Sequence, residues 1–228
     1  MLEGRSSETG SEAAGSGPYG ICIADTADRG EQLVECRRML RKLLILMCCF
    51  FVPAAASGDD ANVDAAKKYV SRNVLPWVDD PVIIDAVRDQ NAKHANLTPA
   101  EINRLDLNWR AQVTTSDRPM VDEVLGRDIS RFLARKQDAS RGLITEIFVM
   151  DNKGLNVGQS TITSDYWQGD EAKWQQTFNV GPGVVFVDGG DVDESTRARQ
   201  SQASITISDP ATGEVIGAIT VGIDLDRL

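Results

Sequence analysis

The apolar residues of this chain change their spacing near Gly142, and this change limits the folds open to it. Before Gly142 they recur every three or four residues, as on one face of a helix, and after it they alternate with polar residues, as in strands. Helices followed by strands predict separate layers rather than repeated βαβ units. The sequence therefore predicts an α+β domain with long N-terminal helices packed on one face of an antiparallel sheet.

The helical half divides into four stretches. An apolar stripe over 63–77 forms the first. Residues 79–81, Asp-Asp-Pro, predict the start of the second helix, and Thr-Pro-Ala-Glu at 98–101 is a capping box that opens the third. The fourth covers 121–133 and is interrupted by Gly126.

The second half predicts five strands. Residues 143–150 alternate, which places the odd-numbered residues on one face and the even-numbered ones on the other. The turn at 151–154 makes the first two strands a hairpin, and a crossover precedes a three-stranded meander. The predicted strands are 143–150, 155–160, 183–188, 201–208 and 214–224.

An aromatic and charged segment, residues 163–174, lies between two predicted strands. It combines a tyrosine and two tryptophans with carboxylates, as in small-molecule pockets, because flat rings cover ligand surface while polar groups fix orientation. The alternative is that Trp167 and Trp174 are core residues closing one end of the sheet. In a short helix expected over 170–178, Trp174 and Phe178 are spaced to lie together against the sheet.

Residues 39–56 have the layout of a secretory signal peptide: a basic start, a short apolar run and three alanines. We expect cleavage after Ala56 and a periplasmic mature protein. The apolar run is about half the roughly 20 residues that a membrane-spanning helix needs, so no stable membrane anchor is expected. Because a signal peptide normally begins at the initiator, Met39 is interpreted as the start, and residues 1–38 as a mis-assigned or disordered leader.

The remaining residues, 57–228, fit one domain with a full hydrophobic core. All four cysteines precede residue 57, so neither disulfides nor thiol chemistry is expected in the exported protein. The net charge of −10 of the whole chain lies almost entirely in 57–228. Such an acidic protein repels phosphate backbones and anionic lipid, which disfavours nucleic acid and membrane surfaces as partners.

Four segments carry a resemblance to a known family: Glu146-Ile-Phe-Val-Met-Asp-Asn-Lys-Gly154, Asp165-Tyr-Trp-Gln168, Asp193-Glu-Ser-Thr196 and the closing Gly213-Glu-Val-Ile-Gly-Ala-Ile-Thr-Val-Gly-Ile-Asp224. Their order resembles that of the extracytoplasmic, PAS-like sensor domains called Cache or PDC domains, over essentially all of 57–228. The resemblance implies a five-stranded sheet on a long helix, with a ligand between the sheet and the segment after the second strand. It also implies signal transduction, with a membrane receptor or histidine kinase as partner.

The resemblance also implies ligand-binding residues. Tyr166, Trp167 and Gln168 stand where amino-acid-binding members of the family keep an aromatic pair. Asp193 stands where those members keep an acid for the ligand's ammonium group.

One position departs from the family pattern. Amino-acid-binding members have an arginine just before the tryptophan, where this chain has Asp165. Lys173 is the available cationic partner, but an ammonium lacks the bidentate fork that arginine offers a carboxylate. The surplus of carboxylates suits a cationic ligand such as an amine, with Trp167 available for a cation–π contact. The alternative for Asp170 and Glu171 is that they cap the short helix and solvate the loop.

Metal sites and catalysis find little support in the sequence. The acidic stretch 188–194 offers oxygen ligands for calcium but lacks the EF-hand order, so it is interpreted as a solvated turn. His94, the only histidine, has no Cys or His partner for zinc and is interpreted as a helix terminator. No nucleophile elbow, phosphate loop or dinucleotide fingerprint is present. We therefore expect no enzyme activity, no metal and no cofactor.

Three functions from different classes stay open. The preferred hypothesis is an exported, sensor-like module that binds a small polar or cationic solute, such as an amine, an amino acid or a related solute, and presents it to a membrane receptor or kinase. The alternative is a non-catalytic protein-interaction scaffold with a vestigial pocket. The third is a hydrolase with an unrecognised site.

Overall fold

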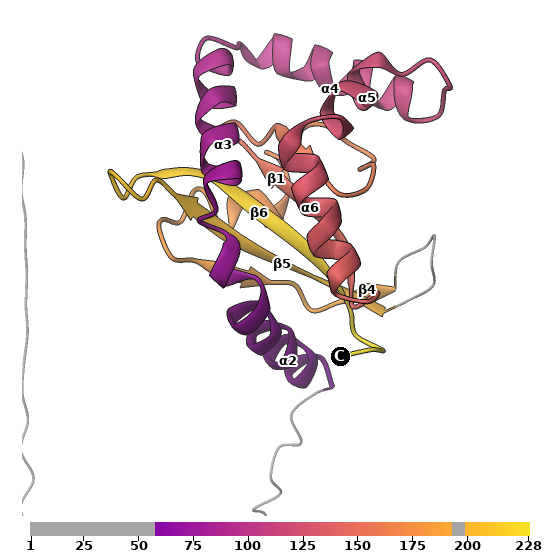
Figure 1. The fold of residues 1–228 in the computed structure, drawn as a ribbon, viewed down its shortest axis with the longest axis vertical. Coiled ribbons are helices and arrows are strands. Elements are labelled where there is room, and N and C mark those ends of the chain that lie inside the picture. Colours follow the sequence, from indigo (N-terminus) through magenta and orange to yellow (C-terminus); the bar gives the residue numbers. More distant parts are fainter. Residues whose placement is uncertain (1–57, 193–198) are drawn as a thin grey trace, which may run out of the picture. The chain divides into compact units, whose positions relative to one another are not determined.

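The computed structural model describes residues 58–192 and 199–228 (Figure 1). The predicted leader and signal peptide, together with Asp193, lie outside these ranges. Within them, no helix combines the length and the apolar character that crossing a membrane requires.

Hydrogen bonds confirm the predicted helix starts. The Asp80 carboxylate accepts from the Val82 N–H at 3.0 Å, and Thr98 and Glu101 form the predicted capping box. The fourth predicted stretch is two helices, because the first of them ends at Gly126, a residue with weak helix propensity. The helices are α2 (Gly58–Asn73), the single turn η1 (Leu75–Trp77), α3 (Pro81–His94), α4 (Pro99–Val113), α5 (Pro119–Leu125) and α6 (Asp128–Ala139).

The second half forms one antiparallel sheet, as predicted, with one more short strand than expected. Its strands are β1 (Ile144–Met150), β2 (Asn156–Gln159), β3 (Val185–Val187), β4 (Asp191–Val192), β5 (Arg199–Ser208) and β6 (Val215–Asp224). The spatial order is β2-β1-β6-β5-β3, and β4 pairs with β5. The additional strand, β4, comes from the stretch interpreted as a solvated turn, and it pairs with the part of β5 that extends beyond β3.

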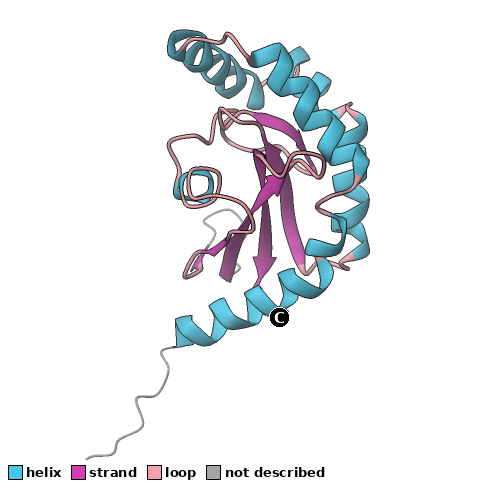
Figure 2. Ribbon diagram, turned by 90° about the vertical axis from the view of Figure 1, so that its left-hand side faces the viewer, coloured by secondary structure: helices cyan, strands magenta, loops and turns pink. Residues whose placement is uncertain are grey.

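Helices α2, α3 and α6 cover one face of the sheet (Figure 2). We call residues 160–184, which join β2 to β3 and include the single-turn helix α7 (Ala172–Gln175), the crossing segment. It lies over the other face of the sheet (Figure 2). The helix-covered face is apolar, and burying it supplies the main driving force for folding. This core includes Ala66, Val70, Ile83, Val87 and Leu133 from the helices and Ile147, Val149, Ile205, Val221 and Ile223 from the sheet.

A bulge in β1 overturns part of the alternation predicted for residues 143–150. The register between β1 and β6 shifts between Ile144 and Glu146, because β1 has one extra residue there. Ile144 consequently packs with Ile147 in the helix-covered core. Thr145 and Glu146 both line a cavity on the opposite face. The prediction that placed Thr145 beside Ile147 is therefore wrong.

An ion pair ties α3 to the turn between β5 and β6. Arg88 donates to both carboxylate oxygens of Asp209, at 2.8 and 2.6 Å. The hydrogen bond from Arg88, aided by the Ala211 and Thr212 N–H groups, lowers the pKa of Asp209 to about 2. Since the unfolded-state pKa is about 3.9, the resulting stabilisation is fully present above that pH and is lost as the pH falls toward 2.

Replacing Asp209 by asparagine is expected to remove this acid-sensitive contribution. At pH 6 the variant should be less stable than the parent, and the difference should shrink as the pH falls from about 4 to about 2. Urea unfolding at several pH values measures it. Asp85→Asn is the matched control, because the Asp85 carboxylate lies 3.5 Å from Arg88 at an exposed site. A stability difference that stays constant down to pH 2 would contradict the assignment.

Candidate functional site

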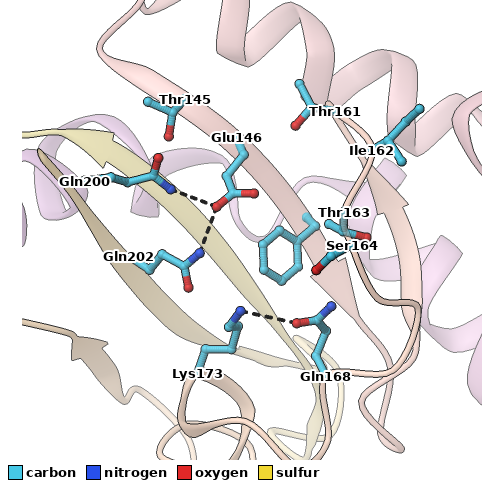
Figure 3. A pocket seen from close by; sticks show the side chains of 11 residues that line it. Thr145, Glu146, Thr161, Ile162, Thr163, Ser164, Gln168, Lys173, Gln200 and Gln202 are labelled. Carbon is cyan, nitrogen blue, oxygen red and sulfur yellow. Dashed lines mark hydrogen bonds between the residues drawn. The ribbon is translucent and has the colours of Figure 1, made fainter. Parts of the chain in front are cut away.

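A cavity of about 520 Å³ opens between the sheet and the crossing segment (Figure 3). Its size is within the range of small-molecule pockets, about 300–1,000 Å³. Polar side chains dominate its walls. It is lined by Thr145, Glu146 and Phe148 from β1, by Gln200 and Gln202 from β5, and by Thr161, Ile162, Thr163, Ser164, Gln168 and Lys173 from the crossing segment.

Two amides of β5 hold the carboxylate of Glu146 in place. Its Oε1 atom accepts from Gln200 Nε2 at 2.9 Å and from Gln202 Nε2 at 2.8 Å (Figure 3). These bonds reach over β6, which separates β1 from β5. A charged side chain fixed by two donors on a sheet is preorganised for binding.

Gly222 of β6 leaves the space in which these side chains meet. It is the register partner of both Glu146 and Gln202. A Cβ atom at this position would lie 2.4 Å from Thr145 Oγ1 and 2.6 Å from Gln200 Nε2. A side chain at position 222 would therefore have to displace these neighbouring side chains.

Thr145 adds a hydroxyl group to the lining of the cavity. Its Oγ1 is buried and has no hydrogen-bond partner among the residues that the structure describes. Buried polar groups normally have a partner, so this hydroxyl is an exception on the floor of the cavity.

Lys173 is the other charged residue among the described residues that line the cavity, and its charge is compensated. Its Nζ lies 2.7 Å from Glu171 Oε2 and donates to Gln168 Oε1 at 3.3 Å. It also lies 5.4 Å from the centre of the Phe148 ring, within cation–π range. Glu146 takes part in no ion pair among the described residues, so it carries the uncompensated charge of the lining.

The structure brings two of the residues predicted for ligand binding, Gln168 and Lys173, together at the cavity. Asp165, Tyr166 and Trp167 are not among the residues that line it. Asp193 lies outside the described residues.

Helix α4 fixes this wall from behind. The Asp106 carboxylate accepts the N–H groups of Tyr166 and Trp167 at 2.9 and 3.0 Å. The Tyr166 ring stacks on Trp109 with centroids 5.4 Å apart, and burial raises its pKa to about 12. Asp165 forms an ion pair with Arg110 at 3.0 Å. These contacts hold the backbone from which Gln168 reaches the cavity.

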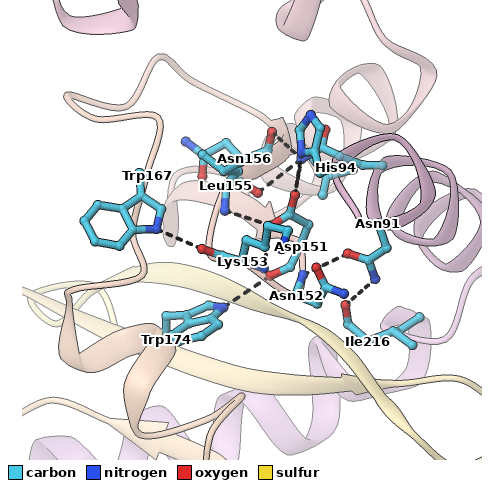
Figure 4. A network of polar contacts seen from close by, with 12 residues as sticks. Asn91, His94, Asp151, Asn152, Lys153, Leu155, Asn156, Trp167, Trp174 and Ile216 are labelled. Carbon is cyan, nitrogen blue, oxygen red and sulfur yellow. Dashed lines mark hydrogen bonds and ion pairs between the residues drawn. The ribbon is translucent and has the colours of Figure 1, made fainter. Parts of the chain in front are cut away.

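The turn between β1 and β2 connects the crossing segment to α3 (Figure 4). On one side, Trp174 Nε1 donates to the Asp151 carbonyl at 3.2 Å, and Trp167 Nε1 donates to the Lys153 carbonyl at 2.8 Å. Trp174 also stacks on Phe178 with centroids 4.8 Å apart, which confirms their predicted association. Both tryptophans thus attach the crossing segment to one short turn.

On the other side of the turn, the fully buried carboxylate of Asp151 binds α3. It accepts from Gln90 Nε2 at 3.0 Å, and its Oδ2 lies 2.8 Å from His94 Nδ1 (Figure 4). It also accepts the N–H groups of Lys153 and Leu155. His94 is the last residue of α3, as its interpretation as a helix terminator predicts, but it also has this buried partner. In the described part of the chain, no group of three or more His, Cys, Asp or Glu residues is arranged to hold a metal.

Sequence reasoning missed the residues that form the polar floor. The available signals were a carboxylate, Glu146, inside an otherwise apolar strand, and glutamines at the alternate positions 200 and 202. These signals are ambiguous, because polar residues at alternate strand positions also occur on a solvent-exposed face.

No protein-family model and no curated protein match this sequence. Similar solved structures include the sensor domain of the Vibrio cholerae histidine kinase DctB, with 13% identity, 86% of this chain and 57% of that chain covered, and a TM-score of 0.42. The Escherichia coli DcuS sensor domain has 15% identity, 73% and 94% coverage, and a TM-score of 0.43. The Campylobacter jejuni chemoreceptor Tlp3 ligand-binding domain, solved with L-valine, has 12% identity, 88% and 66% coverage, and a TM-score of 0.36. These are likenesses of fold alone.

Proposed function

We propose that the protein binds a small polar or cationic solute in the cavity between the sheet and the crossing segment. The observation that carries this proposal is a cavity of about 520 Å³ whose lining combines amides, hydroxyls, one carboxylate and one ammonium group. Strand residues that hydrogen-bond to one another hold several of these groups in fixed positions. Such an arrangement supports orientation-specific binding.

Direct contact and wall support are separate roles in this proposal. Gln168 and Lys173 contact the ligand, because both line the cavity. Asp165, Tyr166 and Trp167 position the segment that carries Gln168. Asp193 stays a proposed contact for a cationic group of the ligand.

In this proposal the protein acts in signalling and is not an enzyme. It is exported to the periplasm as residues 57–228, a single sensor-like domain, and passes the signal to a membrane receptor or histidine kinase. This part rests on the signal-peptide layout of residues 39–56 and on the sequence resemblance to Cache or PDC domains.

A thermal-shift screen of the purified protein tests the proposal. We expect one class among amines, amino acids, carboxylates and polyols to raise the melting temperature with saturation. A ligand at a hundred times its dissociation constant should add about 2.7 kcal/mol to the free energy of unfolding. If no class produces a saturable shift, the protein-interaction scaffold becomes the better hypothesis.

A further inference from the structure

We infer that Glu146 anchors the positive charge of the ligand, and that the ligand is an organic cation, an amine or guanidinium compound, without a carboxylate. The inference rests on the proposed function and names the class of solute bound at the same cavity.

The first step is the balance of charge. Of the two charged residues that the structure places in the lining, Lys173 has a carboxylate partner, Glu171, at 2.7 Å. Glu146 is bound by two neutral amides, which orient its charge without cancelling it. The Glu146 side chain is partly shielded from solvent. Electrostatic attraction at such a site is stronger than in bulk water. The lining therefore favours a cation.

The second step is the direction of the hydrogen bonds. Gln200 and Gln202 turn their NH₂ groups toward Glu146 Oε1, so the acceptors that remain on these amides are carbonyl oxygens. Together with the carboxylate, they form a cluster of acceptors on the floor. Ammonium and guanidinium groups offer several N–H donors and no acceptor, which matches this cluster.

The third step concerns Lys173, the group that a ligand carboxylate would need. Its Nζ already has Glu171 and Gln168 as acceptors and the Phe148 ring beside it. A ligand carboxylate would have to displace the Glu171 carboxylate from this position. Amino acids should therefore bind less well than amines of the same length.

Isothermal titration of the purified protein with four probes of similar backbone tests this inference. The probes are 4-amino-1-butanol, agmatine, 1,4-butanediol and 4-aminobutanoate. We expect the first two to bind at least about tenfold more tightly than the uncharged diol, since a charge-assisted hydrogen bond contributes about 1.5–3 kcal/mol and about 1.4 kcal/mol is tenfold. They should also bind more tightly than 4-aminobutanoate, because its carboxylate would have to compete with Glu171 for Lys173.

The Glu146→Gln variant removes the charge but keeps a carbonyl oxygen for the two amides. We expect it to bind the amines at least about tenfold less tightly. Glu214→Gln, which removes an exposed carboxylate from the β5–β6 turn, is the matched control and should bind like the parent.

Two sets of results would overturn the inference in different ways. If 4-aminobutanoate or the diol binds most tightly, or if Glu146→Gln binds amines like the parent, the inference is wrong while the proposed binding function stands. If no probe binds and the wider thermal-shift screen is also negative, both are wrong. Should Glu146→Gln fail to fold, the ranking of the probes on the parent protein still decides.

Discussion

Replacing Trp109 by alanine is expected to lower the free energy of unfolding by about 3–5 kcal/mol. Trp109 is fully buried in α4, stacks on Tyr166, and donates from Nε1 to the Thr163 carbonyl at 2.9 Å. Its loss leaves both a cavity and an unpaired carbonyl. Because Thr163 lines the cavity proposed to bind the ligand, the variant should also lose the thermal stabilisation expected from a bound ligand. Urea unfolding with and without ligand measures both effects.

Two further variants separate the causes of this loss. Trp109→Phe keeps a ring against Tyr166 but removes the Nε1 donor, so it should lose less stability than Trp109→Ala. Leu107→Ala on the same helix removes an exposed side chain and should change stability by no more than about 0.5 kcal/mol. Equal losses in Leu107→Ala and Trp109→Ala would show that helix propensity, not burial, dominates.

Replacing Asp151 by alanine is expected to cost a similar amount, about 3–5 kcal/mol, because it leaves a set of buried donors without an acceptor. The carboxylate is fully buried and binds the turn, Gln90 and His94. Chemical denaturation of the variant measures the loss. Retention of parental stability would mean that solvent or a rearranged side chain replaces Asp151.

The control for Asp151 is an exposed aspartate of α3, the helix that the Asp151 carboxylate binds. Asp85 has a side chain that is 70% exposed and lies 3.5 Å from Arg88. Asp85→Ala should therefore change stability by no more than about 0.5 kcal/mol. The contrast between the two variants isolates the effect of burial.

Local sequence patterns predicted the parts of the fold that depend on neighbouring residues. The capping box at Thr98 and the stacking of Trp174 on Phe178 each involve residues three or four positions apart, and both are confirmed. Five of the six strands lie where the alternation predicted them. The bulge at Thr145 escaped prediction because it is set by pairing with β6 rather than by the composition of β1.

The polar floor of the cavity could not be predicted for the same reason. Glu146 and its amide partners are 54 and 56 positions apart in sequence, and they meet only because β6 lies between β1 and β5. Asp151 and His94 are 57 positions apart. The periodicity of a sequence indicates which face a residue occupies within its own helix or strand. It does not indicate the order of the strands in the sheet.

The central place of β6 also has a consequence for folding kinetics. The hairpins β1–β2 and β5–β6 are local and can form early, whereas pairing β1 with β6 closes a long loop, which makes it entropically costly and slow. Because Gly222 and the residues around it complete the cavity floor only when that pairing is made, species that precede sheet closure lack the proposed binding site. A ligand should therefore slow unfolding of the protein without accelerating the steps that lead up to closure of the sheet.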